Sequence, residues 1–184
     1  DYFDGLRRFS RNGVERTLVL FLGSNIGNFE PYEARRTLSA VRETLRPGDS
    51  LLMGADMKKD PAVLEAAYND KLGVTAAFNK NLLLRINREL GGHFDLDSFR
   101  HRAKFNSAEG RVEMHLVSDT AQDVLIDGLG MTVHFEPGES IHTESSYKYD
   151  PKQVEALADE TGFRVAQTWT DSAKTFTSNL LVAR

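Results

Sequence analysis

Cysteine is absent from the chain of 184 residues, so a disulfide, a thiolate metal site and a cysteine nucleophile are all excluded. Apolar runs stay well short of the roughly 18 residues that a membrane helix needs, and the N-terminal residues resemble neither a signal nor a transit peptide. Positive charge is not in excess, because 23 Lys and Arg face 27 Asp and Glu for a net charge of −4. Scattered charges of this kind argue against a nucleic-acid partner. We therefore expect a cytoplasmic protein with no nucleic-acid or membrane partner.

The most informative segment is an apolar run that ends in a glycine-rich turn. Residues 17–22 are β-prone and almost wholly apolar, and residues 23–28 are mostly glycine and small polar residues. Such a run predicts a strand buried on both faces, as in the parallel sheet of an α/β domain. Ligands of these sheets bind beyond the carboxyl ends of the strands. The turn is therefore the first candidate site.

Hydrophobic periodicity divides the rest of the chain into three parts. A helix at 31–45 and a strand at 50–56 complete a strand–helix–strand crossover with the first strand. Near residue 58 the pattern changes to helices followed by alternating strands, which favours an α+β insertion. From Pro151 the crossover style returns. The later elements predicted are helices at 61–68 and 75–90 (the second with Leu82, Leu83 and Leu84 on its inner side), strands at 111–118 and 131–135, a helix from Pro151 that ends at Gly162, and strands at 163–171 and 176–182.

The first strand lacks an obvious neighbour, since only about 16 residues precede it and few of them are apolar. A bare strand edge promotes pairing with other chains. We infer that the chain is the C-terminal part of a longer protein. We also expect the open edge to be covered by self-association or by an unanticipated segment.

Six motifs follow one another along the chain. They are residues 23–29 (GSNIGNF), 67–70 (AYND), 73–79 (GVTAAFN), 86–90 (INREL), 112–116 (VEMHL) and 138–149 (GESIHTESSYKY). In order and spacing this set resembles the S-adenosylmethionine-dependent, histidine-specific methyltransferases. The best-known members of that family trimethylate the α-amino group of histidine to give hercynine, at the start of ergothioneine biosynthesis. The resemblance extends over essentially the whole chain.

The resemblance implies a Rossmann-like methyltransferase domain with an inserted substrate-binding domain, and S-adenosylmethionine (SAM) as the methyl donor. We accordingly expect a partial methyltransferase domain at 1–58, the insertion at 59–148, and a return to the methyltransferase sheet at 149–184. Family members begin well before the first residue here, so most of the cofactor site is expected to be missing. Asp1 and Tyr2 match the acid–aromatic pair near the adenine and are the expected cofactor-binding residues.

Gly23 and Asn28 are the candidate substrate-binding residues after the first strand. In the family the matching Asn contacts the backbone atoms of the substrate amino acid, and an Asn amide can donate to a carboxylate and accept from an amine. The Gly matches a position whose backbone approaches the substrate amine. Both residues also have a simpler interpretation, because Gly and Asn are common in tight turns.

The expected insertion adds three candidates. By resemblance, Tyr68 binds the substrate carboxylate, Thr75 borders the pocket and Met114 lies against the imidazole ring. Each has a structural alternative: a half-buried Tyr, an N-cap for a helix that begins at Ala76, and a Met of the hydrophobic core.

Glu144 and Ser146 are two positions apart in an expected strand, so their side chains point to the same face. A carboxylate on one imidazole nitrogen and a hydroxyl on the other would recognise both ends of the ring. The resemblance implies that this pair selects histidine. Without it, an acid and a serine on a solvated strand would be the simpler interpretation.

Methyl transfer requires little acid–base chemistry, because the sulfonium methyl group is already activated and the amine must be deprotonated, desolvated and aligned. We therefore assign no general base. We also assign no metal, since His93 and His101 lack a further spaced ligand. The resemblance implies a histidine Nα-methyltransferase that needs its missing part for activity. Two alternatives stay open: a module that binds an amino acid without catalysis, and a family member that methylates another imidazole or aromatic amino acid.

Overall fold

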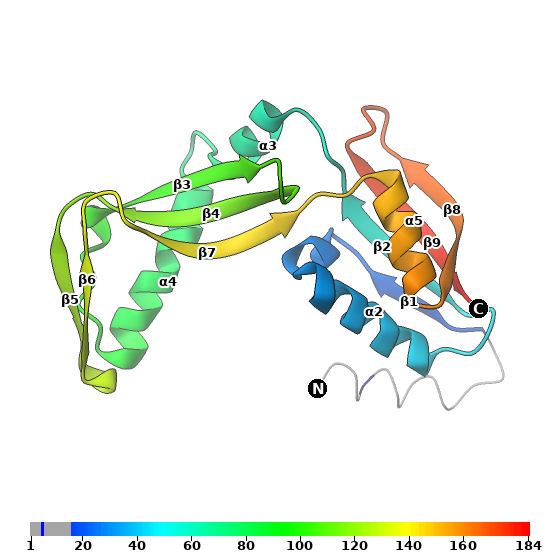
Figure 1. Cartoon of the computed structure of the whole chain (residues 1–184), viewed down its shortest axis with the longest axis horizontal. Coiled ribbons are helices and arrows are strands. Elements are labelled where there is room, and N and C mark those ends of the chain that lie inside the picture. The colour runs from blue at the N-terminus through cyan, green and yellow to red at the C-terminus, as the bar shows by residue number, and fades with distance from the viewer. Residues whose placement is uncertain (1–4, 6–15) are drawn as a thin grey trace. The chain divides into compact units, whose positions relative to one another are not determined.

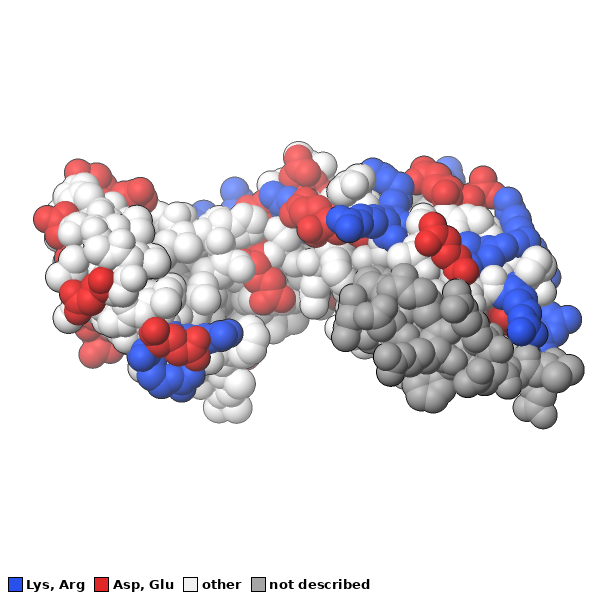
Figure 2. Space-filling model, turned by 90° about the horizontal axis from the view of Figure 1, so that it is seen from below, with Lys and Arg blue, Asp and Glu red and all other residues white. Residues whose placement is uncertain are grey.

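The structure is a computed structural model that describes residue 5 and residues 16–184. The chain divides into two compact units. The first unit combines Asp1–Lys59 with Ser145–Arg184, and the second unit is Asp60–Glu144. None of the described helices is long and apolar enough to cross a membrane. On the face shown in Figure 2, basic and acidic side chains of the described residues are interspersed.

The first unit is built on a four-stranded mixed sheet (Figure 1). Its elements are β1 Leu18–Phe21, the 3-10 helix η1 Asn25–Asn28, α2 Pro31–Thr44, β2 Ser50–Asp56, α5 Pro151–Glu160, β8 Phe163–Thr170 and β9 Phe176–Ala183. The strand order is β1-β2-β9-β8. β1 is parallel to β2, whereas β9 is antiparallel to both of its neighbours. The α/β class and the parallel crossover predicted from the sequence are confirmed.

The core of the first unit lies between the sheet and helices α2 and α5. Val19 on β1 pairs with Leu51 on β2, which pairs with Leu181 on β9, and all three side chains are buried. The opposite face of β1 is open, since Leu18 and Leu20 are 55% and 54% exposed. The prediction of a strand buried on both faces is therefore wrong. The described helices α2 and α5 both pack on the Val19 side, so among the described residues the alternate side chains of β1 stay exposed.

The second unit contains two helices, a three-stranded sheet of order β3-β4-β7 and a two-stranded ribbon, β5-β6. Its elements are α3 Pro61–Tyr68, α4 Val74–Leu90, the 3-10 helices η2 Leu96–Ser98 and η3 Asp127–Leu129, and the strands β3 Phe99–Asn106, β4 Arg111–Ser118, β5 Gln122–Ile126, β6 Met131–Phe135 and β7 Ser140–Tyr147, which ends in the first unit. The helices pack against β3 through buried apolar clusters that include Leu64, Leu83 and Phe99.

The predicted inner side of α4 needs correction. Of Leu82, Leu83 and Leu84, Leu83 is fully buried, whereas the other two are 41% and 48% exposed. Successive residues of a helix are rotated by about 100°, so three consecutive leucines cannot share one face. The predicted end of the helix is confirmed, because Gly91 follows Leu90 in the left-handed conformation of a C-cap (φ 62°).

The chain leaves the first unit after β2 and re-enters it before α5. The segments at these two crossings, residues 56–58 and Tyr149, pair with each other through backbone hydrogen bonds. The Lys58 N–H donates to the Tyr149 carbonyl at 2.8 Å, and the Tyr149 N–H donates to the Asp56 carbonyl at 2.9 Å. The side chains of Lys58 and Asp150 form an ion pair at 3.4 Å. These contacts fix both ends of the connection from within the first unit.

Candidate functional site

The loop after β1 is held against β2 by close backbone contacts. Gly23 and Ser24 both adopt the left-handed conformation, with φ of 74° and 57°. The Ser24 hydroxyl accepts a hydrogen bond from the Asp56 N–H at 2.8 Å. Gly54 favours this approach, because a Cβ atom there would lie only 3.3 Å from the Gly23 nitrogen; it would also lie 2.8 Å from the Phe176 ring. The loop at Gly23 and Ser24 therefore lies directly against β2.

Asn28 ends the loop with an exposed side chain. Its amide forms no hydrogen bond to any described residue, whereas Asn25 stabilises the turn by donating to the Leu22 carbonyl at 2.9 Å. The neighbouring Gly27 lies against the end of β7, because a Cβ atom there would be 2.6 Å from the Tyr147 carbonyl oxygen. The Asn28 loop and the segment that carries Ser146 are thus neighbours within the first unit.

Ser146 is buried and bound to a buried lysine. The Lys148 ammonium donates to the Ser146 hydroxyl at 2.8 Å and lies 3.0 Å from the Asp56 carboxylate. The Ser146 hydroxyl accepts in this contact, and its own O–H is a donor. Sequence reasoning missed Lys148. The available signal was its position two residues after Ser146, which predicts the same face of an extended segment.

Tyr68 lies at the end of α3, where the neighbouring Asn69 ties the helix to β3. The Asn69 amide donates to the Ala103 carbonyl and accepts from the Ala103 N–H, both at 3.1 Å. His101 lies 2.8 Å from the Tyr68 carbonyl through Nε2 and 3.0 Å from the Asn79 amide nitrogen through Nδ1. An amide NH₂ is a donor, so His101 accepts at Nδ1 and donates from Nε2 to Tyr68. The backbone of Tyr68 is therefore fixed from two sides.

Asp70 stabilises the start of α4. Its carboxylate accepts from the N–H groups of Thr75 and Val74 at 2.8 and 2.9 Å. These hydrogen bonds, those of Thr75 first, lower the pKa of Asp70 to about 2. One interpretation of Thr75 from the sequence is an N-cap for a helix that begins at Ala76. That interpretation is wrong, because α4 begins one residue before Thr75 and the Asp70 carboxylate takes the first-turn N–H groups.

Met114 and Tyr68 belong to one hydrophobic cluster. Met114 is buried together with Leu64 and Val112, and the partly buried Tyr68 packs against this cluster. The Thr143 hydroxyl donates to the Met114 carbonyl at 2.9 Å, which joins β7 to β4 next to Glu144. Tyr68, Met114 and the backbone at Glu144 are therefore brought together in the second unit. The structural alternative for Met114, a core residue, is compatible with this burial.

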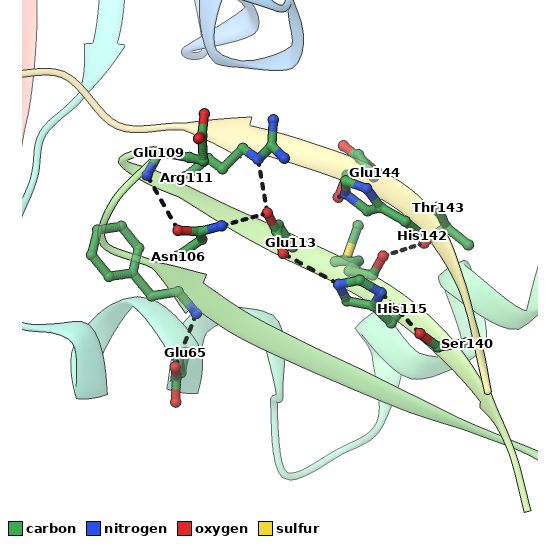
Figure 3. Close-up of polar contacts among 12 residues, drawn as sticks. Glu65, Asn106, Glu109, Arg111, Glu113, His115, Ser140, His142, Thr143 and Glu144 are labelled. Atoms are coloured by element: carbon green, nitrogen blue, oxygen red, sulfur yellow. Dashed lines mark hydrogen bonds and ion pairs between the residues drawn. The ribbon is translucent and has the colours of Figure 1, made fainter. Parts of the chain in front are cut away.

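A polar network covers β4 next to this cluster (Figure 3). Glu113 accepts from the Asn106 amide at 3.0 Å and from Arg111 Nε at 2.9 Å, and its other oxygen lies 3.4 Å from His115 Nε2. Burial raises the pKa of Glu113, but the hydrogen bonds from Asn106, Arg111 and His115 outweigh it and bring the pKa to about 2. Glu113 is therefore ionised at neutral pH.

The network continues to Glu144 through two stacked imidazoles. The rings of His115 and His142 are 4.9 Å apart between centroids with 20° between their planes. His142 Nε2 lies 3.1 Å from the Glu144 carbonyl oxygen. The strand that carries Glu144 is thus held by β4 through both Thr143 and His142. Sequence reasoning did not identify this network.

Comparison with known proteins decides the family. A sequence model described as "Histidine-specific methyltransferase, SAM-dependent" matches residues 1–183. The chain belongs to this family. The resemblance stated from the six motifs is thereby confirmed, and the mixed sheet fits the Rossmann-like fold that it implies.

Two relatives of this methyltransferase-family chain bear the name histidine N-alpha-methyltransferase. The protein of Mycolicibacterium smegmatis is 50% identical over 169 residues, which cover 92% of this chain and 53% of the relative. The protein of Mycobacterium tuberculosis is 46% identical over 176 residues, covering 96% and 54%. The chain therefore spans about half the length of these curated relatives. A solved SAM-dependent methyltransferase of Clostridium acetobutylicum is 10% identical, with a TM-score of 0.47 and coverage of 95% of this chain and 62% of that one.

No residue that the sequence predicts to bind SAM is among the residues that the structure describes. The loop at residues 22–29 carries no carboxylate for the ribose hydroxyls. Asp56, at the end of β2, is already held by Lys59 at 2.6 Å and Lys148 at 3.0 Å. Asp1 and Tyr2, the expected cofactor-binding residues, lie outside the described residues.

Proposed function

We propose that the whole protein transfers methyl groups from SAM to the α-amino nitrogen of histidine. The observation that carries this proposal is the family match over residues 1–183, together with two relatives at 50% and 46% identity that are named histidine N-alpha-methyltransferase. SAM supplies an activated methyl group. The residues of this chain would bind the amino acid, strip water from its amine and align it.

We assign the substrate contacts as the family resemblance implies. Asn28, whose amide has no partner among the described residues, would bind the α-amino and carboxylate groups, with the Gly23 backbone near the amine. Tyr68 would bind the carboxylate. Glu144 and Ser146 would recognise the imidazole, and Lys148 supports Ser146 in the role of donor. Thr75 and Met114 would border the bound amino acid.

Steady-state kinetics of the full-length protein with histidine and SAM test this function. Glu144→Gln removes the charge of the acceptor and keeps its shape, which should weaken recognition by about 2 kcal/mol, or about 30-fold in kcat/KM. Glu109→Gln, an exposed acid of the same unit, is the matched control. Wild-type enzyme that methylates another amine but not histidine would refute the substrate. Equal kinetics for Glu144→Gln and Glu109→Gln would refute the site.

A second candidate function is amino-acid binding without catalysis by the 184-residue chain. It is favoured by the contrast between the described substrate candidates and the missing carboxylate for the ribose. Calorimetry with histidine tests it: heat of binding without methyl transfer supports the binding module.

A third candidate, another aromatic amino acid as substrate, is favoured by the L-tryptophan methyltransferase of Psilocybe serbica, 28% identical over 181 residues. Undiminished use of histidine by Glu144→Ala would point to it.

We further propose that the 184-residue chain self-associates through β1. The proposal rests on the exposure of Leu18 and Leu20 and on the position of β1 at the end of the described sheet. An unpaired parallel strand with apolar side chains on its open face is a template for pairing with another chain. The cytoplasmic location expected from the sequence stays a prediction.

A further inference from the structure

The first unit contains a cavity of about 300 Å³ that none of the proposed substrate-binding residues lines. It lies between α5 and the β8–β9 hairpin, and Met57 and Tyr149, from the two paired segments of the chain, close it on another side. This volume is at the lower end of the range for pockets that bind small molecules. The cavity is therefore large enough for a ligand with a single ring or a branched chain.

The floor of the cavity is polar where the rest of the same sheet face is apolar. The buried positions of β9 are Ala183 and Leu181 in the core, then Asn179 and Thr177 in the cavity. Thr168 of β8 donates to the Asn179 amide oxygen at 2.9 Å, and the Asn179 nitrogen donates to the Thr177 hydroxyl at 2.9 Å. Buried polar side chains in place of core residues suit a partly polar occupant.

The walls are apolar. Met57 and Val154 are buried, and Val165 and Tyr149 are partly buried side chains that pack against the core of the first unit. Burial raises the pKa of Tyr149 to about 12, with a smaller contribution from Tyr147, so its ring presents an uncharged surface. These four residues offer an apolar enclosure for the body of a ligand.

Two lysines line the cavity, Lys58 and Lys174, and they differ in their partners among the described residues. Lys58 is paired with Asp150, whereas the Lys174 side chain has no hydrogen bond or ion pair with any described residue. Lys174 adopts a left-handed conformation (φ 54°), in a turn where the Asp171 carboxylate accepts from the N–H of Phe176 at 2.9 Å. Lysine is uncommon in this conformation. The turn fixes the backbone of Lys174 at the mouth of the cavity.

We propose that this cavity binds a small monocarboxylate with an apolar body. The carboxylate would pair with Lys174 and the Thr170 hydroxyl, which has no hydrogen bond within the described residues, and the body would occupy the apolar enclosure. A dianionic phosphate is disfavoured for two reasons. A single cation is available, and the Asp150 carboxylate already takes the Gln153 N–H at 2.9 Å in the first turn of α5.

Binding of 3-phenylpropionate to the ¹⁵N-labelled 184-residue chain, followed by amide chemical shifts, tests the proposal. We expect saturable shifts at cavity residues with a Kd of about 1 mM or tighter, and clearly weaker binding of the neutral 3-phenylpropanamide. Lys174→Asn keeps a residue that tolerates the left-handed conformation and should weaken binding about 5-fold. Glu155→Gln should tighten binding about 2-fold, because Glu155 is a like charge that lines the same cavity.

Lys152→Gln, an exposed lysine of α5 outside the cavity lining, is the matched control and should leave the Kd unchanged. Val165→Phe should fill the cavity and abolish binding, and its amide spectrum reports whether the chain stays folded. Absence of saturable shifts would overturn the proposal, as would shifts confined to residues outside the cavity. Equal affinity for the acid and the amide, or an unchanged Kd in Lys174→Asn, would overturn the role of the carboxylate.

Discussion

Glu113 carries a charge that the surrounding hydrogen bonds maintain against burial. Its pKa of about 2 lies below the ordinary value of 4.5 because Asn106, Arg111 and His115 all donate to the carboxylate. A carboxyl group with a lowered pKa stabilises the fold above its unfolded pKa, and this contribution is lost as the pH falls through the folded value. The relevant window therefore runs from about pH 4.5 down to about pH 2.

We predict that Glu113→Gln destabilises the chain at neutral pH and that the difference from wild type shrinks across this window. Urea unfolding of both proteins at a series of pH values measures it. Glu109→Gln, in the same turn region but exposed, is the control and should change the free energy of unfolding little. A difference for Glu113→Gln that stays constant from neutral pH to about pH 2 would contradict the linkage.

At the scale of elements, the loop η1 depends on glycine where it meets β7. A Cβ atom on Gly27 would lie 2.6 Å from the Tyr147 carbonyl oxygen, a backbone atom that cannot rotate away. The loop and the end of β7 would have to separate, with loss of packing around the buried Ile26. The same separation would move Asn28 relative to Ser146.

Gly27→Ala should therefore unfold at a lower temperature than wild type. The expected loss in free energy of unfolding is typical of overpacking, about 1–3 kcal/mol. Differential scanning calorimetry of the 184-residue chain measures the change. Gly5→Ala is a suitable control, because a Cβ atom there would meet nothing within 4 Å. Equal melting temperatures for the two variants would show that the loop tolerates the added methyl group.

Local patterns in the sequence predicted the elements whose own residues determine them. Pro31 and the spacing of Leu38 and Val41 were enough for α2, and the alternation at Val112 and Met114 was enough for β4. The sequence pattern did not predict β3, because three of its eight residues are Arg or Lys. The apolar side of this strand is evident only in the structure, where Phe99 packs against Leu83 of α4.

In the candidate site too, local patterns predicted some residues, whereas others depend on contacts between distant parts of the chain. Glu144 and Ser146 were found by their alternation and by resemblance. Lys148 and His101 were missed, because their roles depend on Asp56 and Tyr68, which are 92 and 33 residues away in the sequence. No local pattern encodes a contact between residues so far apart. The contacts of Lys148 and His101 can therefore be identified only from the folded structure.

In the first unit as a whole, one face of the sheet carries a row of leucines that the described residues cover only in part. Leu20 on β1 pairs with Leu52 on β2, which pairs with Leu180 on β9, so one row of leucines crosses three strands. Leu20 is 54% exposed, and the other two are partly buried. A contiguous apolar row beside a strand edge is typical of a surface that associates with another chain.

We expect the 184-residue chain to self-associate and Leu20→Lys to weaken the association, because a lysine on the open face must be desolvated when another chain covers it. Sedimentation velocity over a wide range of protein concentrations measures the effect. Leu129→Lys, at an exposed leucine (57%) of the second unit, is the matched control and should associate like wild type. If the wild-type chain is a monomer at every concentration, the open face does not drive association. If both variants weaken association equally, the effect comes from added charge and not from β1.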